Sequence, residues 1–198
     1  MNGAELVFPL AGASLRGDYA LPLWKALRGL LPWLADEATA AILPIKGATA
    51  GAEGLILGKR AQLALRLPEA RLAAAALIAG ARLNLGTELR LGEPTRRELR
   101  PTSAQYSPMV AQGSGDEAQF LAECELELAT LSIAASLICG KSQVRLDEAG
   151  ELRGFSLMLH GLSAEHALRL QNVGLGQARK LGCGIFVAHK TAVAVGAI

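Results

Sequence analysis

Hydrophobic and polar positions follow two different periods along the first half of the chain. Residues 5–10 form a short, mostly apolar run, which predicts a buried strand. Leucines then recur at steps of three and four residues, which predicts a helix over about 19–31 with Asp18 as its N-cap. In residues 62–67 every second residue is a leucine, and this period of two predicts a half-buried strand.

Further segments complete the first half. Residues 69–79 are rich in alanine and predict a second helix, which Gly80 would end. Residues 83–91 alternate between leucine and polar residues on both sides of a Gly86-Thr87 turn, which indicates strand structure. Together with residues 41–45, these segments give the order strand, helix, strand, strand, helix, strand.

The same order recurs after a segment bounded by Pro94 and Pro101. Its strand, helix, two strands, helix and strand are expected over 104–111, 116–131, 143–146, 155–160, 164–173 and 184–189. Acidic residues begin the first of these helices, and Ser163 caps the second. Two successive βαββαβ halves predict an α+β fold of two tandem ferredoxin-like (RRM-like) domains, over 1–95 and 96–198.

Charge is distributed unevenly, although the net charge of the 198 residues is only +2. The balance is +5 over residues 59–100, −5 over 101–140 and +3 over 141–198. Two basic stretches around an acidic one are compatible with a positive face for a polyanion, and equally with ordinary solvated surfaces. A hydrophobic content of 51% is enough for a sizeable core and excludes a disordered chain.

Cys124, Cys139 and Cys183 form no CxxC pair and cannot all pair with one another, which favours a reducing compartment. The apolar runs are shorter than the roughly 20 residues of a membrane-spanning helix, and the N-terminus lacks a basic stretch followed by an apolar run. We therefore expect a soluble, cytoplasmic protein without a membrane partner.

The densest chemical signal is the segment 174–184, which contains Gly174, Gly176, Gly182, Gly184 and the adjacent cations Arg179 and Lys180. Glycines allow backbone N–H groups to approach an anion closely, so the segment predicts phosphate contact. The helix precedes the segment and a strand follows it, which is the reverse of a dinucleotide fingerprint, and no Gly-Lys-Ser/Thr is present for a P-loop. The alternative is that these glycines only make a tight connection from helix to strand.

Several motifs, spread in order over most of the chain, resemble one family. They are Gly161-Leu162-Ser163-Ala164-Glu165, Leu170-Gln171-Asn172-Val173-Gly174-Leu175-Gly176, Arg179-Lys180-Leu181-Gly182-Cys183-Gly184-Ile185-Phe186-Val187, Asp18-Tyr19-Ala20-Leu21-Pro22-Leu23-Trp24-Lys25-Ala26-Leu27, Leu43-Pro44-Ile45-Lys46-Gly47, Leu65-Arg66-Leu67-Pro68, and Tyr106 with its neighbours. With them the chain resembles the CRISPR repeat-processing endoribonucleases, in particular the short branch first described from myxobacterial systems.

This resemblance implies two ferredoxin-like domains that bind CRISPR repeat RNA, and cleavage that needs neither a metal nor another cofactor. The 2′-hydroxyl next to the scissile phosphate would attack it and leave a 2′,3′-cyclic phosphate and a 5′-hydroxyl. The protein would then stay on the guide RNA (crRNA) with the other subunits of a type I effector complex. The runner-up hypothesis is a non-catalytic subunit that only binds the repeat, and a small-molecule phosphate-binding enzyme is a third.

Tyr19 is the important departure from the family. Relatives commonly have Asp-His at the start of the first helix, with the histidine as general base, and this chain has Asp18-Tyr19. Because a tyrosine has a pKa of about 10, forming its phenolate at pH 7 costs roughly 4 kcal/mol unless a cation lowers that pKa. Lys25 matches a catalytic lysine of some relatives and is the candidate cation. The alternative for Tyr19 is an ordinary aromatic residue at a helix start.

Other basic residues are candidate RNA contacts. The cluster Arg96, Arg97 and Arg100 lies between the two expected domains, where RNA crossing both would need positive charge. His189 and Lys190 follow the glycine-rich segment directly. The three histidines and the cysteines fit no zinc spacing, and we expect no metal site. With four Phe, two Tyr and two Trp, recognition of a hairpin by shape and phosphate contact is the better hypothesis than base stacking.

Overall fold

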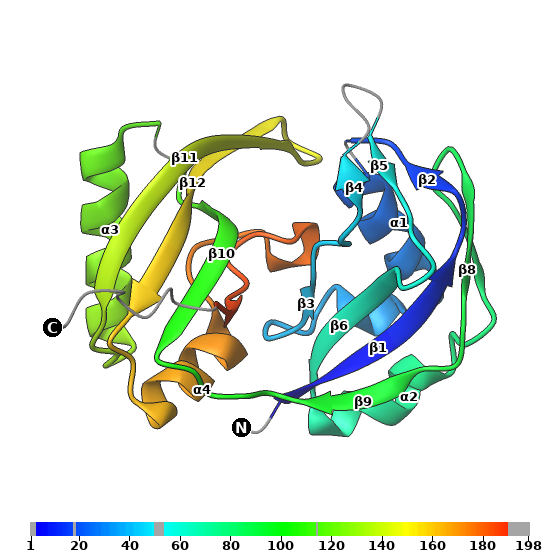
Figure 1. The fold of residues 1–198 in the computed structure, drawn as a ribbon, viewed down its shortest axis with the longest axis horizontal. Coiled ribbons are helices and arrows are strands. Elements are labelled where there is room, and N and C mark those ends of the chain that lie inside the picture. The colour runs from blue at the N-terminus through cyan, green and yellow to red at the C-terminus, as the bar shows by residue number, and fades with distance from the viewer. Residues whose placement is uncertain (1–2, 18, 50–53, 114, 190–198) are drawn as a thin grey trace, which may run out of the picture. The chain divides into compact units, whose positions relative to one another are not determined.

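A six-stranded antiparallel sheet forms the centre of the first of two units into which the chain divides (Figure 1). The computed structural model describes residues 3–17, 19–49, 54–113 and 115–189. The first unit takes Met1–Leu99, Val144–Leu152 and Ala178–Gly182, and the second takes Arg100–Gln143, Arg153–Gln177 and Cys183–Ile198. Two short segments from late in the sequence therefore belong to the first unit.

The sheet of the first unit is built on the long strand β1. Its order is β3-β6-β1-β8-β7, with β9 paired to β1 as well. The strands are β1 (Gly3–Ala11), β3 (Ala41–Ile42), β6 (Gln62–Pro68), β7 (Arg82–Asn84), β8 (Glu88–Leu91) and β9 (Thr95–Glu98). Alternation explains the pairing of β1 with β6, because Phe8 and Leu63 share a register position and both are fully buried. The strands predicted over 5–10 and 62–67 are confirmed.

Two helices and a second, smaller sheet complete the first unit. The helices are α1 (Ala20–Leu30) and α2 (Leu72–Ala76), accompanied by the 3₁₀ turns η1 (Pro32–Leu34) and η3 (Glu69–Arg71). The smaller sheet joins β2 (Ser14–Leu15), β5 (Leu55–Ile56) and β4 (Ala48–Thr49). Leu23 and Leu27 of α1 lie in the same buried cluster as the inward side chains of β1 and β6.

The helices of the first unit differ from the prediction at their ends. Tyr19, not Asp18, is the N-cap residue of α1, and Asp18 lies outside the described residues. The helix predicted over 69–79 is only five residues long, because η3 precedes it and i→i+3 hydrogen bonds replace the helical pattern after Ala76. Gly80 follows with φ of +78°, a conformation that suits the end of this turn.

The second unit holds a four-stranded sheet in the order β11-β12-β10-β13 (Figure 1). Its elements are β10 (Ala104–Ala111), α3 (Glu117–Thr130), β11 (Ser136–Leu146), β12 (Glu151–His160), α4 (Ala164–Val173), η4 (Arg179–Leu181) and β13 (Val187–Ala188), of which the ends of β11 and β12 and all of η4 belong to the first unit. Phe120 of α3 and Phe155 of β12 pack ring to ring at 4.9 Å between centroids in the core.

Capping residues explain where the helices of the second unit begin. Asp116 Oδ1 accepts a hydrogen bond from the Gln119 N–H, and Ser163 Oγ accepts one from the His166 N–H. The strand predicted over 104–111 and both helices are confirmed. Strands β11 and β12 are longer than predicted, and β13 is reduced to two residues.

Residues 95–98, expected to be part of a linker, form strand β9 instead. All four are exposed and carry no apolar alternation, so the local pattern contains no strand signal. β9 nevertheless pairs with β1 over Ala4–Val7. The backbone N–H and C=O groups on this side of β1 need hydrogen-bond partners, and β9 supplies them whatever its side chains are.

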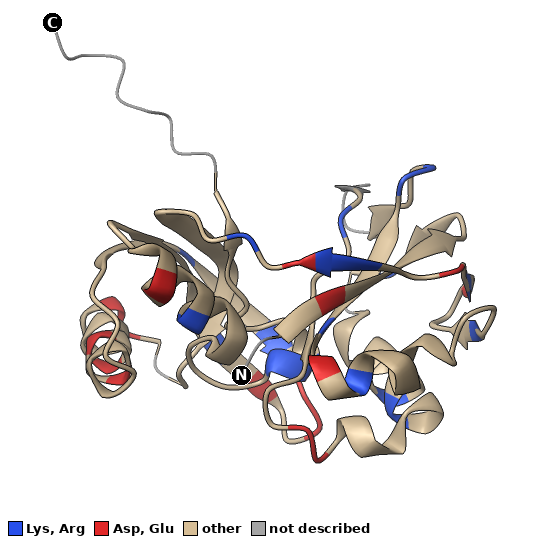
Figure 2. Ribbon diagram, turned by 90° about the horizontal axis from the view of Figure 1, so that it is seen from below, with Lys and Arg blue, Asp and Glu red and all other residues tan. Residues whose placement is uncertain are grey.

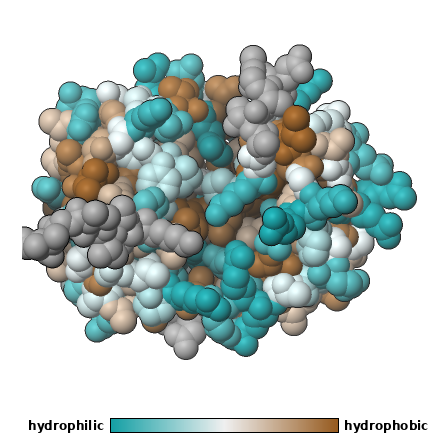
Figure 3. Space-filling view, viewed as in Figure 1, coloured by the Kyte–Doolittle hydropathy of each residue, from teal (hydrophilic) through white to brown (hydrophobic). Residues whose placement is uncertain are grey.

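Surface character varies between the elements. Figure 2 shows acidic residues along α3, which carries no basic residue, and basic residues on β9. Figure 3 shows hydrophobic patches among hydrophilic ones on one face of the molecule. Leu77 and Leu126 are among the exposed large apolar side chains. Within the described residues, no helix has the length and apolar character to cross a membrane.

Candidate functional site

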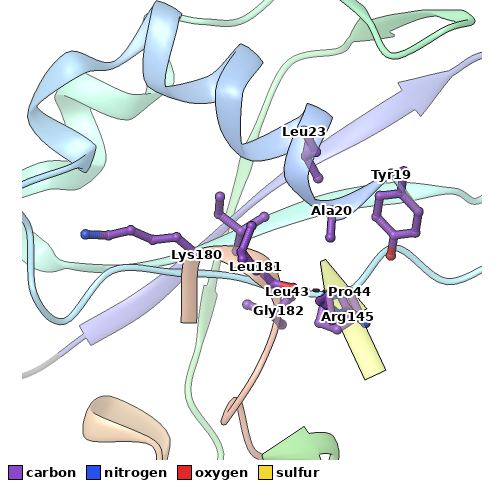
Figure 4. A pocket seen from close by; sticks show the side chains of 10 residues that line it. Tyr19, Ala20, Leu23, Leu43, Pro44, Arg145, Lys180, Leu181 and Gly182 are labelled. Carbon is purple, nitrogen blue, oxygen red and sulfur yellow. Dashed lines mark hydrogen bonds between the residues drawn. The ribbon is translucent and has the colours of Figure 1, made fainter. Parts of the chain in front are cut away.

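A small pocket lies at the start of α1, and all of its lining residues belong to the first unit (Figure 4). They are Tyr19, Ala20, Leu23, Ile42, Leu43, Pro44, Arg145, Lys180, Leu181 and Gly182. The space in it that is open to a water-sized sphere has a volume of about 10 Å³, enough for about one water molecule. A metabolite does not fit inside this space, so a ligand would contact the residues around its opening.

Tyr19 is buried in the wall of this pocket. Its hydroxyl accepts a hydrogen bond from the Ile45 N–H at 2.9 Å and donates a longer one to the Ile45 carbonyl at 3.4 Å. Burial raises the pKa of this phenol above its ordinary value of 10.0, while the Ile45 hydrogen bond and the charge of Arg145 act in the opposite direction. The phenol is therefore protonated at neutral pH.

Lys25 is not the cation that acts on Tyr19. It is exposed on α1, and its Nζ lies 3.8 Å from Glu148, which also pairs with Arg28 at 3.2 Å. The charge that counteracts the rise in the pKa of the Tyr19 phenol comes from Arg145. Arg145 lines the same pocket as Tyr19, and the role of Lys25 in catalysis stays a prediction.

Lys180 is held by the segment that follows η1. Its Nζ donates to the Ala35 carbonyl at 2.6 Å and lies 5.7 Å from the centroid of the Trp24 ring. Partial burial lowers the pKa of this amine, although Asp36 and Glu37 oppose the shift. Lys180 therefore fastens the segment 178–182 to the rest of the first unit.

Arg179 is more deeply buried than Lys180. Its Nη2 donates to the Thr39 carbonyl at 3.3 Å, whereas its Nε and Nη1 are buried and have no partner within the described residues. Burial and the neighbouring charge of Arg66 lower the pKa of Arg179 to about 10. Both cations of the glycine-rich segment thus bind backbone carbonyls of residues 35–39.

The four glycines of this segment have their own N–H groups satisfied within the chain. The acceptors for Gly174, Gly176, Gly182 and Gly184 are the Leu170 carbonyl, the Glu127 carboxylate, the Arg179 carbonyl and the Met109 carbonyl. All four have positive φ, between 63° and 82°. A Cβ on Gly184 would stand 1.9 Å from the Leu175 carbonyl oxygen. These facts favour the alternative of a tight structural connection, and the phosphate contact stays a prediction.

The arginine cluster is split between the two units and is largely neutralised. Arg97 pairs with Glu5 at 2.7 Å, and Arg96 pairs with Glu69 and Glu98 at 3.0 and 2.9 Å. Arg100 is exposed and belongs to the second unit. An RNA strand would compete with these carboxylates for Arg96 and Arg97.

The remaining candidates belong to the second unit or lie outside the described residues. His189 is exposed, and its ring is 5.7 Å from that of Tyr106. Lys190 lies outside the described residues. His166 Nδ1 accepts a hydrogen bond from the Ala134 N–H at 3.2 Å. In the described part of the chain, no three His, Cys, Asp or Glu side chains gather where they could hold a metal ion.

Arg145 is the pocket residue that sequence reasoning missed. It is one of several basic residues in the stretch 141–198, and nothing in the local pattern connects it with Tyr19. A signal for Arg145 in the sequence is its place two residues before Asp147, because this puts it next to the turn between two predicted strands. That turn brings it to the start of α1.

Comparison with solved structures defines the class first: a mixed α/β fold of antiparallel sheets with helices. A structure of a Cas6-related gene product from Pyrococcus furiosus matches with a TM-score of 0.68 at 12% identity, over 96% of this chain and 99% of that one. Thermus thermophilus Cse3, solved with an RNA that represents a pre-cleavage complex, matches with a TM-score of 0.57 at 15% identity, over 94% and 98%. These likenesses concern the fold.

Sequence comparison then identifies the family. The family model described as Cas6 Crispr matches residues 4–191. The CRISPR-associated endonuclease Cas6 of Myxococcus xanthus (strain DK1622) is 34% identical over 185 residues, 92% of this chain and 80% of that protein. The chain belongs to the Cas6 family, and the resemblance noted in its sequence is confirmed.

Proposed function

We propose that this chain is an endoribonuclease that binds CRISPR repeat RNA and cuts it into guide RNAs. Membership of a family with a relative named as an endonuclease supports an activity on nucleic acid. The observation that carries the proposal is the small pocket at the start of α1, which the Tyr19 phenol and the Arg145 guanidinium line together. This pocket combines a proton donor with a positive charge, which phosphate-ester cleavage requires.

In the proposed reaction the 2′-hydroxyl attacks the adjacent phosphorus without the help of a metal ion. A bond forms between the 2′-oxygen and phosphorus, the bond from phosphorus to the 5′-oxygen breaks, and the products carry a 2′,3′-cyclic phosphate and a 5′-hydroxyl. Tyr19 and Lys25 are the proposed catalytic side chains. With its raised pKa the Tyr19 phenol is better suited to donate a proton to the leaving 5′-oxygen than to accept one from the 2′-hydroxyl, whose proton then goes to solvent.

We further propose two tandem ferredoxin-like domains, over 1–95 and 96–198, as the frame of this activity. The recurrence of strand, helix and strand order in the two halves supports this description. Retention of the product within a type I effector complex, with RNA contacts at residues 174–184, His189, Lys190 and the arginines 96, 97 and 100, belongs to the same proposal.

A second candidate function is a subunit that binds the repeat without cutting it. The specific observation in its favour is Tyr19, whose buried hydroxyl bonds both to the N–H and to the carbonyl of Ile45. A substrate would have to displace at least one of these hydrogen bonds before the phenol could act on it.

Incubation of the purified protein with labelled repeat RNA in EDTA tests both functions. The repeat is taken from the CRISPR array next to the gene, and a scrambled RNA and a repeat with 2′-deoxy nucleotides serve as controls. Cleavage of the repeat alone, with a 2′,3′-cyclic phosphate on the product, is the expected outcome. Binding without cleavage would select the second function, and failure to bind the repeat would contradict both.

A further inference from the structure

We propose that Arg145 binds one backbone phosphate of the repeat RNA at the mouth of the Tyr19 pocket. This inference rests on the proposed function, because it names the residue of that site that holds the RNA backbone. Figure 4 shows Arg145 and Pro44 on the side of the pocket toward which the Tyr19 hydroxyl points. Three observations carry the proposal: how Arg145 is held, how its charge is balanced, and how much space adjoins it.

The guanidinium of Arg145 is positioned before any ligand arrives. Its Nη1 donates to the Leu181 carbonyl at 2.6 Å. The neighbouring turn is fixed by Asp147, whose Oδ1 accepts from the N–H groups of Ala149 and Gly150 at 2.7 and 2.8 Å. A side chain fixed at one nitrogen, on a turn closed by its own hydrogen bonds, loses little freedom when it binds an anion.

The charge of Arg145 is not balanced by a carboxylate within the described residues. The Leu181 carbonyl is its hydrogen-bond partner there, and it forms no ion pair. Lys25 and Arg28, by contrast, share Glu148, and Lys180 lies near Asp36 and Glu37. Among Lys25, Arg28, Lys180 and Arg145, Arg145 is thus the one without a carboxylate beside it, in the described part of the chain, that would compete with an incoming phosphate.

Glycine at position 182 leaves space beside this guanidinium. Gly182 has φ of +82°, and a Cβ there would stand 3.3 Å from Nη1 of Arg145 and from Cγ of Pro44. Any other residue would therefore press on the side chain that we assign to the phosphate. Gly182 therefore contributes to this site through the space it leaves for Arg145. Its backbone N–H donates to the Arg179 carbonyl.

The chemistry of the guanidinium suits a phosphodiester. Its planar fork can present two N–H groups to the two non-bridging oxygens of one phosphate. Because Nη1 is bound to Leu181, the Nε and Nη2 edge is the side left for that contact. A charge at this place also stabilises the negative charge that grows on the phosphate in the transition state, and it already acts on the Tyr19 phenol.

A methylphosphonate scan of the repeat tests this inference through binding alone. Each RNA carries one uncharged methylphosphonate linkage and a 2′-deoxy nucleotide that prevents cleavage. The parent should lose about tenfold or more in affinity at the linkage that Arg145 contacts, since the hydrogen bond from the charged guanidinium is lost there. Arg145→Ala should bind the unmodified repeat with the same loss and show no further loss at that linkage.

Matched variants separate a specific contact from general charge. Arg60→Ala removes an exposed arginine of the same unit and should leave the scan pattern of the parent unchanged. Arg145→Lys keeps the charge and loses the fork, so it should show a weaker effect at the same linkage. Circular dichroism and thermal melting establish that each variant is folded.

Two results would overturn the inference. If Arg145→Ala repeats the full scan pattern of the parent, or binds as tightly as Arg60→Ala, then Arg145 contacts no phosphate. If the parent protein itself fails to bind the repeat, the proposed function is wrong and so is this inference. The parent alone shows this outcome, so it is distinguishable from a failure of the Arg145 contact only.

Discussion

At the scale of single residues, Tyr19 joins two roles that conflict. Its hydroxyl ties the start of α1 to the backbone of Ile45, and the same burial that makes this tie effective raises the pKa of the phenol. A histidine in this place would have a pKa of about 6.5 and could exchange protons at neutral pH. The burial and hydrogen bonding of Tyr19 therefore decide whether its phenol can take part in RNA cleavage.

Substitution of Tyr19 should separate binding from chemistry. Tyr19→Phe should abolish cleavage while the repeat stays bound, and Tyr19→His should cut at least as fast as the parent near pH 7. With the phenol as proton donor, the parental rate should not fall up to about pH 9, because the raised pKa keeps the donor protonated, whereas a histidine donor in Tyr19→His should lose its proton above about pH 6.5. Single-turnover rates between about pH 5.5 and 9 measure both slopes.

The other outcomes are equally informative. Parental cleavage by Tyr19→Phe would make Tyr19 a packing residue. An inactive parent with an active Tyr19→His would identify the natural protein as a binding subunit. Because the phenylalanine leaves the buried Ile45 N–H without its acceptor, a loss of about 1–3 kcal/mol in stability is expected, and melting curves must accompany the rates.

At the scale of elements, three strands meet at one buried carboxylate. Glu5 on β1 stands opposite Arg66 of β6 and opposite Arg97 of β9 in the register of the sheet. Its two oxygens lie 2.7 Å from one nitrogen of each arginine. The side chains of Glu5 and Arg66 are 7% and 3% exposed, so this pair is far better shielded than the surface pairs.

Glu5→Gln should therefore destabilise the protein strongly. Removing one partner of a buried ion pair costs about 3–5 kcal/mol, because the remaining charge stays buried. Glu98→Gln removes the exposed partner of Arg96 on the same strand and should cost at most about 1 kcal/mol. Urea unfolding of the parent and the two variants measures the difference, and similar midpoints for both variants would contradict this account of the sheet.

The elements also show how far the sequence could lead. Period and caps alone locate β10, α3 and α4, because their apolar faces and the capping residues Asp116 and Ser163 are local signals. β9 carries no such signal, since all four of its residues are exposed and its only reason to be a strand is the edge of β1. The local sequence also gives no hint that Glu5, Arg66 and Arg97 meet.

The candidate site was predictable only in part for the same reason. The resemblance to a family drew attention to Tyr19, Lys25 and the glycine-rich segment, but not to the partners that fold around them. Whether Lys25 faces Tyr19 or Glu148, and whether Arg179 faces solvent or the Thr39 carbonyl, depends on contacts between residues far apart in the sequence.

At the scale of the whole molecule, affinity for RNA depends on how many cations reach phosphates. Arg179→Ala with Lys180→Ala should flatten the salt dependence of repeat binding by about 0.7–0.9 in the log–log slope for each phosphate that is no longer bound. Because both side chains also bind carbonyls of residues 35–39, the melting temperature should fall as well. An unchanged slope with a lower melting temperature would assign them to the fold alone.

The division of the chain into units has a consequence for protein synthesis. Residues 144–152 and 178–182 belong to the first unit, although most of that unit is made of residues 1–99. Domains generally fold on the ribosome in the order in which they emerge. Here the N-terminal part emerges first and contains Leu23 and Ile42 of the pocket. Arg145 and Leu181, which complete the pocket, are translated only with the second half of the chain. The candidate site is therefore completed late in translation, and truncated chains that contain only its first helix lack the residue we assign to the phosphate.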